Sequence, residues 1–513
     1  MRRTACLLAT LLALVGSPVA AVPEGPGDGT PEWYERELGN FLMTQQEHLR
    51  ELTSPEFQLR LAEQTIANGL DYELFQLENH FVNYGNLCRQ WGESCLGDPF
   101  QYPGFDPFWG DVGGFTETLF YDRDCGRISS RVWYPLDAQP GDDLPGIVIT
   151  NGSVQASETL YWWAAQALVE AGYVVMTWDP RGQGRSDTVT PDGRLGTNFN
   201  SAVFWNGTVD AIDFFRSSPN EPYPHNATCA AAVATNPAWA LVYDLPDAAP
   251  FNPHHDLVDL ERLGLAGHSL GATGVTRVQA MDPWEGLLDQ DNPVDVIVAW
   301  DALRTGEGVT PRVPAMGHTS EYGLTPMPFQ ESPDPEGHTG AHDAWVEAGQ
   351  PVFQFTVRGS SHYEWSLIPS RPIPEFSSTS WLDWGNPMAE HYTVAWFDRW
   401  LKRPGEPGWD TADERLLDDN RFCERLSFYF RSARSFPTRD GAIQDSDDIR
   451  ASCLARAGGA VDRVGDPDGA APPSADDTSG PTPTTGGGAA GLAVVVVLLG
   501  LAATRRKAGV VRR

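Results

Sequence analysis

Positive charge is scarce in this sequence. It contains 36 lysine and arginine residues against 69 aspartate and glutamate residues, which gives a formal net charge of −33 at pH 7. Seven of the basic residues lie at the two ends of the chain, within residues 1–21 and 505–513. An interior this acidic repels phosphate backbones, so a nucleic-acid partner is not expected.

Motifs for metal and nucleotide chemistry are also missing. The sequence has no His-Glu-x-x-His zinc helix, no P-loop and no glycine-rich dinucleotide fingerprint. The acidic run Asp289-Gln290-Asp291 is not continued by the glycine and glutamate that complete a calcium-binding loop. We therefore expect neither a cofactor nor a metal ion.

The N-terminus carries a targeting signal. Residues 1–21 combine two arginines, an apolar run too short to span a bilayer, and the small residues Val19-Ala20-Ala21. This arrangement predicts a secretory signal peptide that is cut after Ala21.

The C-terminus predicts attachment to the cell surface. Residues 457–488 are rich in Gly, Ala, Pro and Asp and form a predicted disordered linker. The apolar segment 489–504 and the basic tail 505–513 then favour insertion into the membrane with the tail inside. The run Thr482-Pro483-Thr484-Thr485-Gly486 also resembles a sortase-type wall-anchoring signal, so membrane anchoring and C-terminal processing both stay open.

Cysteine is rare, with seven residues in the whole chain. Cys6 lies in the signal peptide, which leaves an even number in a protein bound for an oxidising compartment and favours disulfide bonds. Proximity in the sequence predicts the pairs Cys88–Cys95 and Cys423–Cys453. The two cysteines that remain are Cys125 and Cys229.

The residues between the termini fall into three parts. Residues 32–90 carry apolar side chains at helical spacing, which predicts a helical N-terminal extension over residues 22–110. Residues 111–402 open with two extended runs and continue as short apolar strands alternating with helices. This pattern predicts an α/β domain with a mostly parallel central sheet, flanked by helices and bounded by an antiparallel edge. Within it, 187–259 is long enough to contain a lid or binding loop, and 403–456 predicts a small disulfide-bearing segment.

The strongest chemical signal is Gly267-His268-Ser269-Leu270-Gly271, a G-x-S-x-G motif between a predicted strand and a predicted helix. Glycines on both sides allow a tight strand-to-helix turn that exposes the serine hydroxyl. The pattern predicts that Ser269 is a nucleophile. The side chain of His268 is expected to pack beneath the turn.

Several motifs, in this order, resemble the α/β-hydrolase family, and within it the dienelactone-hydrolase and cutinase-like branch that includes bacterial polyester hydrolases. The resemblance covers about residues 115–402. It rests on Asn151-Gly152-Ser153, Tyr161-Trp162-Trp163, TWDPRGQGRSD, GHSLG, GHTSEYG and GSSHYEWS. It implies an α/β-hydrolase fold, and it leaves the charged loop TWDPRGQGRSD as scaffold.

The resemblance also implies a base and an acid for the serine. In this family the histidine follows the last strand, where His362 stands, and it takes the proton of the serine hydroxyl. The acid lies between serine and histidine in chain order. Glu321, after the seventh strand, is the first choice, and Asp301, one strand earlier, is the alternative. The backbone amides of Ser153 and Leu270 match the positions that bind the oxyanion.

These assignments together predict hydrolysis of a carboxylic ester through an acyl-enzyme by a secreted or surface-anchored protein. The expected substrate is a small-molecule, lipid or polymer ester. Two other functions stay open: a serine peptidase on the same fold, and a cell-surface binding protein that keeps the fold without turnover. The oligomeric state is not predicted.

Overall fold

The computed structural model describes most of the chain between Phe108 and Arg456. The described residues are 108–153, 158–184, 186–187, 190, 192–194, 196, 201–234, 248–321, 323, 336–358, 360, 362–366, 385–427 and 430–456. The predicted signal peptide, linker, anchor and basic tail, the Cys88–Cys95 pair and nearly all of the N-terminal extension lie outside them. Within the described ranges, no helix is long and apolar enough to cross a membrane, and no cluster of three or more His, Cys, Asp or Glu side chains could hold a metal ion.

The described strands form one sheet with the order β1-β2-β4-β3-β5-β6-β7-β8-β9-β10. Their bounds are β1 Gly113–Tyr121, β2 Arg127–Pro135, β3 Leu144–Thr150, β4 Val174–Trp178, β5 Val258–His268, β6 Val296–Trp300, β7 Ala315–Ser320, β8 Val352–Val357, β9 Ala433–Pro437 and β10 Ile443–Ser446. The six strands from β4 to β8 in this order run parallel, whereas β1, β2, β9 and β10 pair antiparallel.

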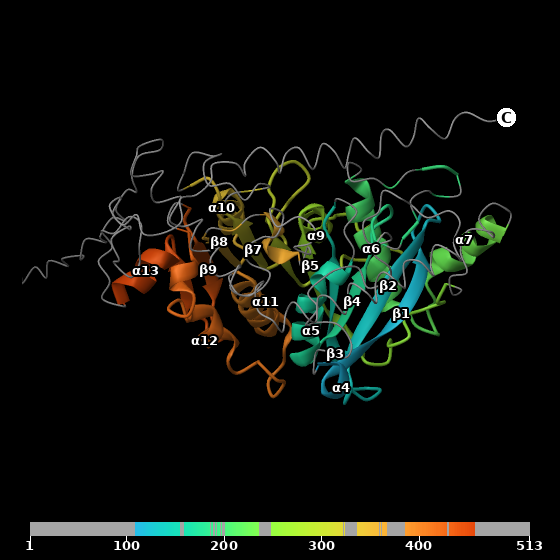
Figure 1. Cartoon of the computed structure of the whole chain (residues 1–513), viewed down its shortest axis with the longest axis horizontal. Helices are drawn as coiled ribbons and strands as arrows, with labels where there is room; N and C mark the ends of the chain where they lie inside the picture. Colours follow the sequence, from blue (N-terminus) through green and yellow to red (C-terminus); the bar gives the residue numbers. More distant parts are fainter. Residues whose placement is uncertain are drawn as a thin grey trace, which may run out of the picture.

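Helices connect the parallel strands and cover both faces of the sheet, as Figure 1 shows. Their bounds are α4 Phe108–Asp111, η2 Glu158–Tyr161, α5 Trp162–Glu170, α6 Ala202–Arg216, α7 Pro224–Ala234, α9 Leu270–Gln279, α10 Gly340–Glu347, η3 His362–Trp365, α11 Asn386–Leu401, α12 Ala412–Leu417, η5 Cys423–Arg425 and α13 Ile449–Arg456. Side chains of α5 and α11 share one hydrophobic core with one face of the sheet. Side chains of α6, α9 and α10 share a second core with the other face.

The predicted fold class is confirmed. Strands β4, β6 and β8 are buried along their whole length, because helices lie on both sides of them. Such strands are continuous apolar runs in the sequence, which is why their positions could be predicted. The hairpin of β1 and β2 forms the expected antiparallel edge, and the whole is an α/β-hydrolase arrangement.

The segment 403–456 contributes to this same sheet. Its strand β9 pairs antiparallel with β8, with Ser435 opposite Val352, and Phe436 enters the core that α11 covers. The disulfide Cys423–Cys453, as predicted, joins η5 to α13. The sheet therefore extends beyond the predicted end of the α/β domain at residue 402.

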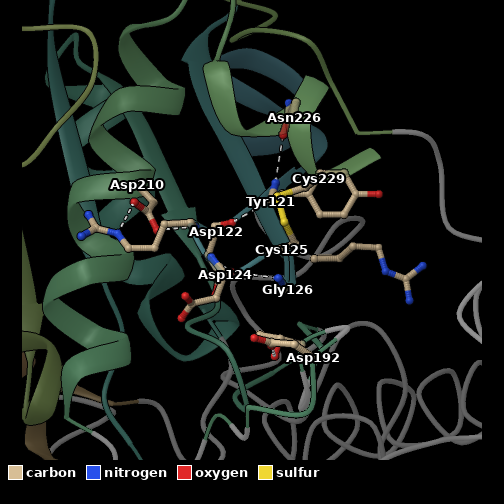
Figure 2. The surroundings of a disulfide bond; sticks show 12 residues. Tyr121, Asp122, Asp124, Cys125, Gly126, Asp192, Asp210, Asn226 and Cys229 are labelled. Carbon is tan, nitrogen blue, oxygen red and sulfur yellow. Dashed lines mark hydrogen bonds and ion pairs between the residues drawn. A yellow bond between two sulfur atoms is a disulfide. The ribbon is translucent and has the colours of Figure 1, made fainter. Parts of the chain in front are cut away.

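The described part of the expected lid, 187–259, lies against the body of the protein. Helix α6 packs on α9 and β3 as one of the helices that cover the sheet. Helix α7 contacts β1, and the disulfide Cys125–Cys229 joins it to the turn between β1 and β2 (Figure 2). Beside this bond the side-chain oxygen of Asn226 accepts a 3.0 Å hydrogen bond from the amide of Tyr121. Residues 235–247 of the same segment lie outside the described ranges.

The two disulfides close loops of different length, with sequence separations of 104 for Cys125–Cys229 and 30 for Cys423–Cys453. The chain entropy of the unfolded state then predicts stabilisation of about 5 and about 4 kcal/mol, respectively. We expect replacement of the first pair by alanines to lower the free energy of unfolding more than replacement of the second, as measured by chemical denaturation. A larger loss on removing the shorter loop would contradict this prediction.

Candidate active site

The turn between β5 and α9 holds Ser269 in an unusual backbone conformation. Its φ of 58° and ψ of −117° are rare for a residue with a side chain and are typical of strained functional turns. A β-carbon at Gly267 would lie 2.5 Å from the carbonyl oxygen of Gly271, and one at Gly271 would lie 2.1 Å from that of Thr150. Both outer positions of the G-x-S-x-G motif therefore require glycine, and the turn presents a half-buried serine side chain.

His362 lies beside this serine, at the start of η3 and shortly after β8. Its Nε2 is 2.8 Å from the hydroxyl oxygen of Ser269. Its backbone amide donates a 2.6 Å hydrogen bond to the carbonyl oxygen of Gly323, which fixes the loop that carries the ring. The imidazole remains 13% exposed, so the pair can be reached from solvent.

The carboxylate on the imidazole belongs to Asp301, and the first choice of Glu321 is thereby corrected. Asp301 follows β6, and its Oδ2 is 2.5 Å from Nδ1 of His362. Its Oδ1 accepts a 2.8 Å hydrogen bond from the amide of Ser320, and the Ser320 hydroxyl also donates to this carboxylate. Burial alone would raise the pKa of Asp301, but the hydrogen bond and charge of His362 and the Ser320 amide hold it below its ordinary value. The carboxylate is therefore ionised when the imidazole is charged.

Glu321 points elsewhere for a geometric reason. Both ring nitrogens of His362 already bond to Asp301 and Ser269. The carboxylate of Glu321 accepts a 2.5 Å hydrogen bond from the hydroxyl of Ser427, and its amide donates to the hydroxyl of Ser360. Glu321 is therefore buried, with an exposed fraction of 3%, and its carboxylate contacts the C-terminal segment at Ser427.

The loop after β3 places Ser153 near the serine hydroxyl. A β-carbon at Gly152 would lie 3.2 Å from that of Ser269, so the two turns are in close contact. Ser153 itself is partly exposed. Leu270, the other predicted oxyanion donor, is the first residue of α9, where a helix leaves its amides without an intrahelical acceptor. Both predicted amides therefore lie on backbone next to Ser269.

Asp179 holds this loop in place, a role that the sequence analysis did not assign to it. Its Oδ1 accepts hydrogen bonds from the side-chain amide of Asn151, at 3.2 Å, and from the backbone amide of Glu158, at 2.8 Å. Gly184, with φ of 41°, lies so close that a β-carbon there would be 2.1 Å from this carboxylate. The signal was present in TWDPRGQGRSD, whose Asp and Gly support the loop that carries Ser153.

His268 packs beneath the turn, as expected. It is 3% exposed, and its Nδ1 and Nε2 lie 2.7 Å from the hydroxyl of Tyr161 and 2.8 Å from the carbonyl oxygen of His362. Burial, with the nearby charge of His362, lowers the pKa of His268 to about 3. The ring is therefore neutral at any working pH.

Comparisons with known proteins give little more. No family model matches the chain, and no curated protein matches it. Among solved structures it is similar to a ferulic acid esterase from Streptomyces cinnamoneus, with a TM-score of 0.32 and 13% sequence identity, over 58% of this chain and 94% of that one. A similarity at this level carries no argument about the fold or the function of this chain.

An experiment can distinguish the roles of the Asp301 and Glu321 carboxylates. Asp301→Asn should slow the labelling of Ser269 by a fluorophosphonate on the order of 10³- to 10⁴-fold, because the amide favours the wrong tautomer of His362 and cannot balance its charge. Glu321→Gln should label at close to the rate of the unmodified protein, because its oxygen can still accept the bond from Ser427. Slower labelling of Glu321→Gln than of Asp301→Asn would contradict the geometric assignment.

Proposed function

We propose that the protein is a serine hydrolase that cleaves carboxylic esters through an acyl-enzyme. The observation that carries this proposal is the continuous series of hydrogen bonds from Asp301 through His362 to the hydroxyl of Ser269. A serine hydroxyl is a weak nucleophile until an oriented base takes its proton. The series supplies that base, and it ends on a side chain that solvent can reach.

Each half of the reaction uses the same groups. The Ser269 hydroxyl attacks the ester carbonyl while Nε2 of His362 takes its proton, and Asp301 stabilises the imidazolium that forms. The imidazolium then returns the proton to the leaving alcohol, which yields the acyl-enzyme. In the second half, His362 takes a proton from water, which attacks the acyl group; the imidazolium then returns this proton to the Ser269 oxygen as the acyl bond breaks and the carboxylic acid leaves.

The negative oxygen of each tetrahedral intermediate needs donors that are already in place. The amides of Leu270 and Ser153 are proposed for this role, because α9 begins at Leu270 and the Gly152–Ser153 backbone lies against Ser269. Asp179 holds the second of these segments through Asn151 and Glu158. Since backbone amides do this work, the side chains of Leu270 and Ser153 contribute less.

The decisive test is Ser269→Ala. We expect the full chain to react with a fluorophosphonate and to turn over p-nitrophenyl acetate and octanoate, and Ser269→Ala to lose labelling and at least about 10³-fold of kcat, because the nucleophile is gone. Ser452→Ala, which alters an exposed serine on α13, should behave like the unmodified chain. Full activity of Ser269→Ala would refute the proposal.

The same assay separates the remaining functions. Cleavage of a peptide p-nitroanilide with little ester turnover would favour a serine peptidase. A well-folded chain that neither labels nor turns over would favour a binding protein. The ratio of acetate to octanoate turnover would begin to define the acyl chain.

We also propose that the chain is exported and held at the cell surface by its C-terminal segment. The two disulfides support this localisation, because such bonds persist in oxidising compartments. The mature protein is expected to begin at Val22, which N-terminal sequencing of the protein from the cell surface would establish. Recovery of a chain that still begins at Met1 would contradict export by the predicted signal.

A further inference from the structure

A series of buried hydrogen bonds passes beneath Ser269. The amide of Gly152 donates to the hydroxyl oxygen of Tyr161 at 2.9 Å, and that oxygen lies 2.7 Å from Nδ1 of His268. Nε2 of His268 lies 2.8 Å from the carbonyl oxygen of His362. Tyr161 is 1% exposed and His268 is 3% exposed, so water does not compete for these groups.

The chemistry of the groups gives each bond one direction. A carbonyl oxygen only accepts, so Nε2 of His268 carries the proton and donates to His362. Because the pKa of His268 is about 3, its Nδ1 is then an acceptor, and the hydroxyl of Tyr161 donates to it. Burial raises the pKa of Tyr161, which keeps this hydroxyl protonated. Every donor in the series meets an acceptor, and no group carries a charge.

The series joins the three segments that carry the reacting groups. Gly152 precedes Ser153 on the loop after β3, His268 precedes Ser269 on the turn after β5, and the last acceptor is the backbone of His362 itself. Tyr161 also stacks on Trp300, with an interplanar angle of 5°, and Trp300 directly precedes Asp301. Tyr161 and His268 thus lie next to Ser269, bond to the backbone of His362, and contact the chain neighbours of Ser153 and Asp301.

We propose that Tyr161 and His268 are positioning residues for the ester hydrolysis, an inference that rests on the proposed function of Ser269. Their hydrogen bonds fix the peptide plane before Gly152 and the backbone of His362 relative to the serine turn. The next peptide bond carries the amide of Ser153, so a displacement of the plane before Gly152 would also displace the second proposed oxyanion donor. Neither side chain touches the substrate.

Tyr161→Phe removes one oxygen and tests the proposal directly. Without it the Gly152 amide and Nδ1 of His268 lose their partner, and the peptide plane before Gly152 is held less firmly. We expect kcat for p-nitrophenyl acetate to fall by about 10- to 100-fold, less than the 10²- to 10³-fold that a whole oxyanion donor is worth. KM should change little, because substrate binding does not use the hydroxyl.

Tyr223→Phe is the matched control. The Tyr223 side chain is also 1% exposed, and its hydroxyl donates a 2.9 Å hydrogen bond to the carbonyl oxygen of Tyr121, on β1 at the edge of the sheet. Both variants lose one buried hydroxyl, but Tyr161→Phe leaves two groups without a partner and Tyr223→Phe leaves one, so the melting temperature should fall in both and further in Tyr161→Phe. Only Tyr161→Phe should lose kcat. Equal kcat values for the two variants would overturn the proposal.

A second pair of variants at His268 covers the case in which Tyr161→Phe does not fold. The amide of glutamine places one acceptor and one donor near the positions of the two ring nitrogens, whereas leucine provides neither. His268→Gln should therefore recover most of the kcat that His268→Leu loses. Equal loss in both would mean that packing alone matters, and would overturn the proposal.

The unmodified chain and Ser269→Ala are measured beside these variants. If the unmodified chain turns over no ester, or if Ser269→Ala is as active as the unmodified chain, the proposed function is wrong. The positioning role is then wrong as well. If the unmodified chain is active through Ser269 and Tyr161→Phe matches Tyr223→Phe, only the positioning role fails.

Discussion

The close approach of two backbone turns determines where the groups of this site lie. At Gly271, α9 begins so near the end of β3 that a β-carbon would lie 2.1 Å from the carbonyl oxygen of Thr150. In this turn Ser269 has a positive φ of 58°, which costs of order 1–3 kcal/mol for a residue with a side chain. The parallel pairing of β3 with β5 holds both turns in register, with Thr150 opposite Gly267. The backbone at Gly152 and the start of α9 at Leu270 therefore both lie beside Ser269.

Much of this architecture could be predicted, because buried parallel strands and the helices between them have distinct periodicities. The hydrogen-bonded pair of Ser269 and His362 could be predicted for a related reason, since each stands in a loop that follows an apolar strand and contains recognisable residues. Strand β9 could not be predicted from the sequence. Its sequence, Ala-Arg-Ser-Phe-Pro, is short and only partly apolar, and it becomes a strand by pairing with β8, 80 or so residues earlier in the chain. The local sequence of β9 gives no information about this pairing with β8.

The acid shows a different limit of sequence reasoning. Asp301 is the residue directly after β6, and Glu321 is the residue directly after β7. In a parallel sheet both positions lie at the same edge, so strand order and chain order allow either carboxylate to face the histidine. The choice depends on the path of the chain after each strand. Asp301 adopts a φ of 45° and bonds to Ser320, the last residue of β7, whereas Glu321 turns to Ser427 in the C-terminal segment. These contacts join residues that are far apart in the chain, so the spacing of residues in the sequence does not predict them.

The buried groups of the hydrogen-bond series next to His362 are neutral. Burial lowers the pKa of His268 to about 3 and raises the pKa of Tyr161, so neither ring is charged near neutrality. The ring of His268 is centred only 4.7 Å from that of His362. A charge on it would oppose protonation of the base, since like charges at that separation in a buried site repel strongly. A neutral hydrogen-bond series can hold His362 and the loop of Gly152 in place without that penalty, and in the proposed reaction the charge of Asp301 would be balanced by the imidazolium that forms.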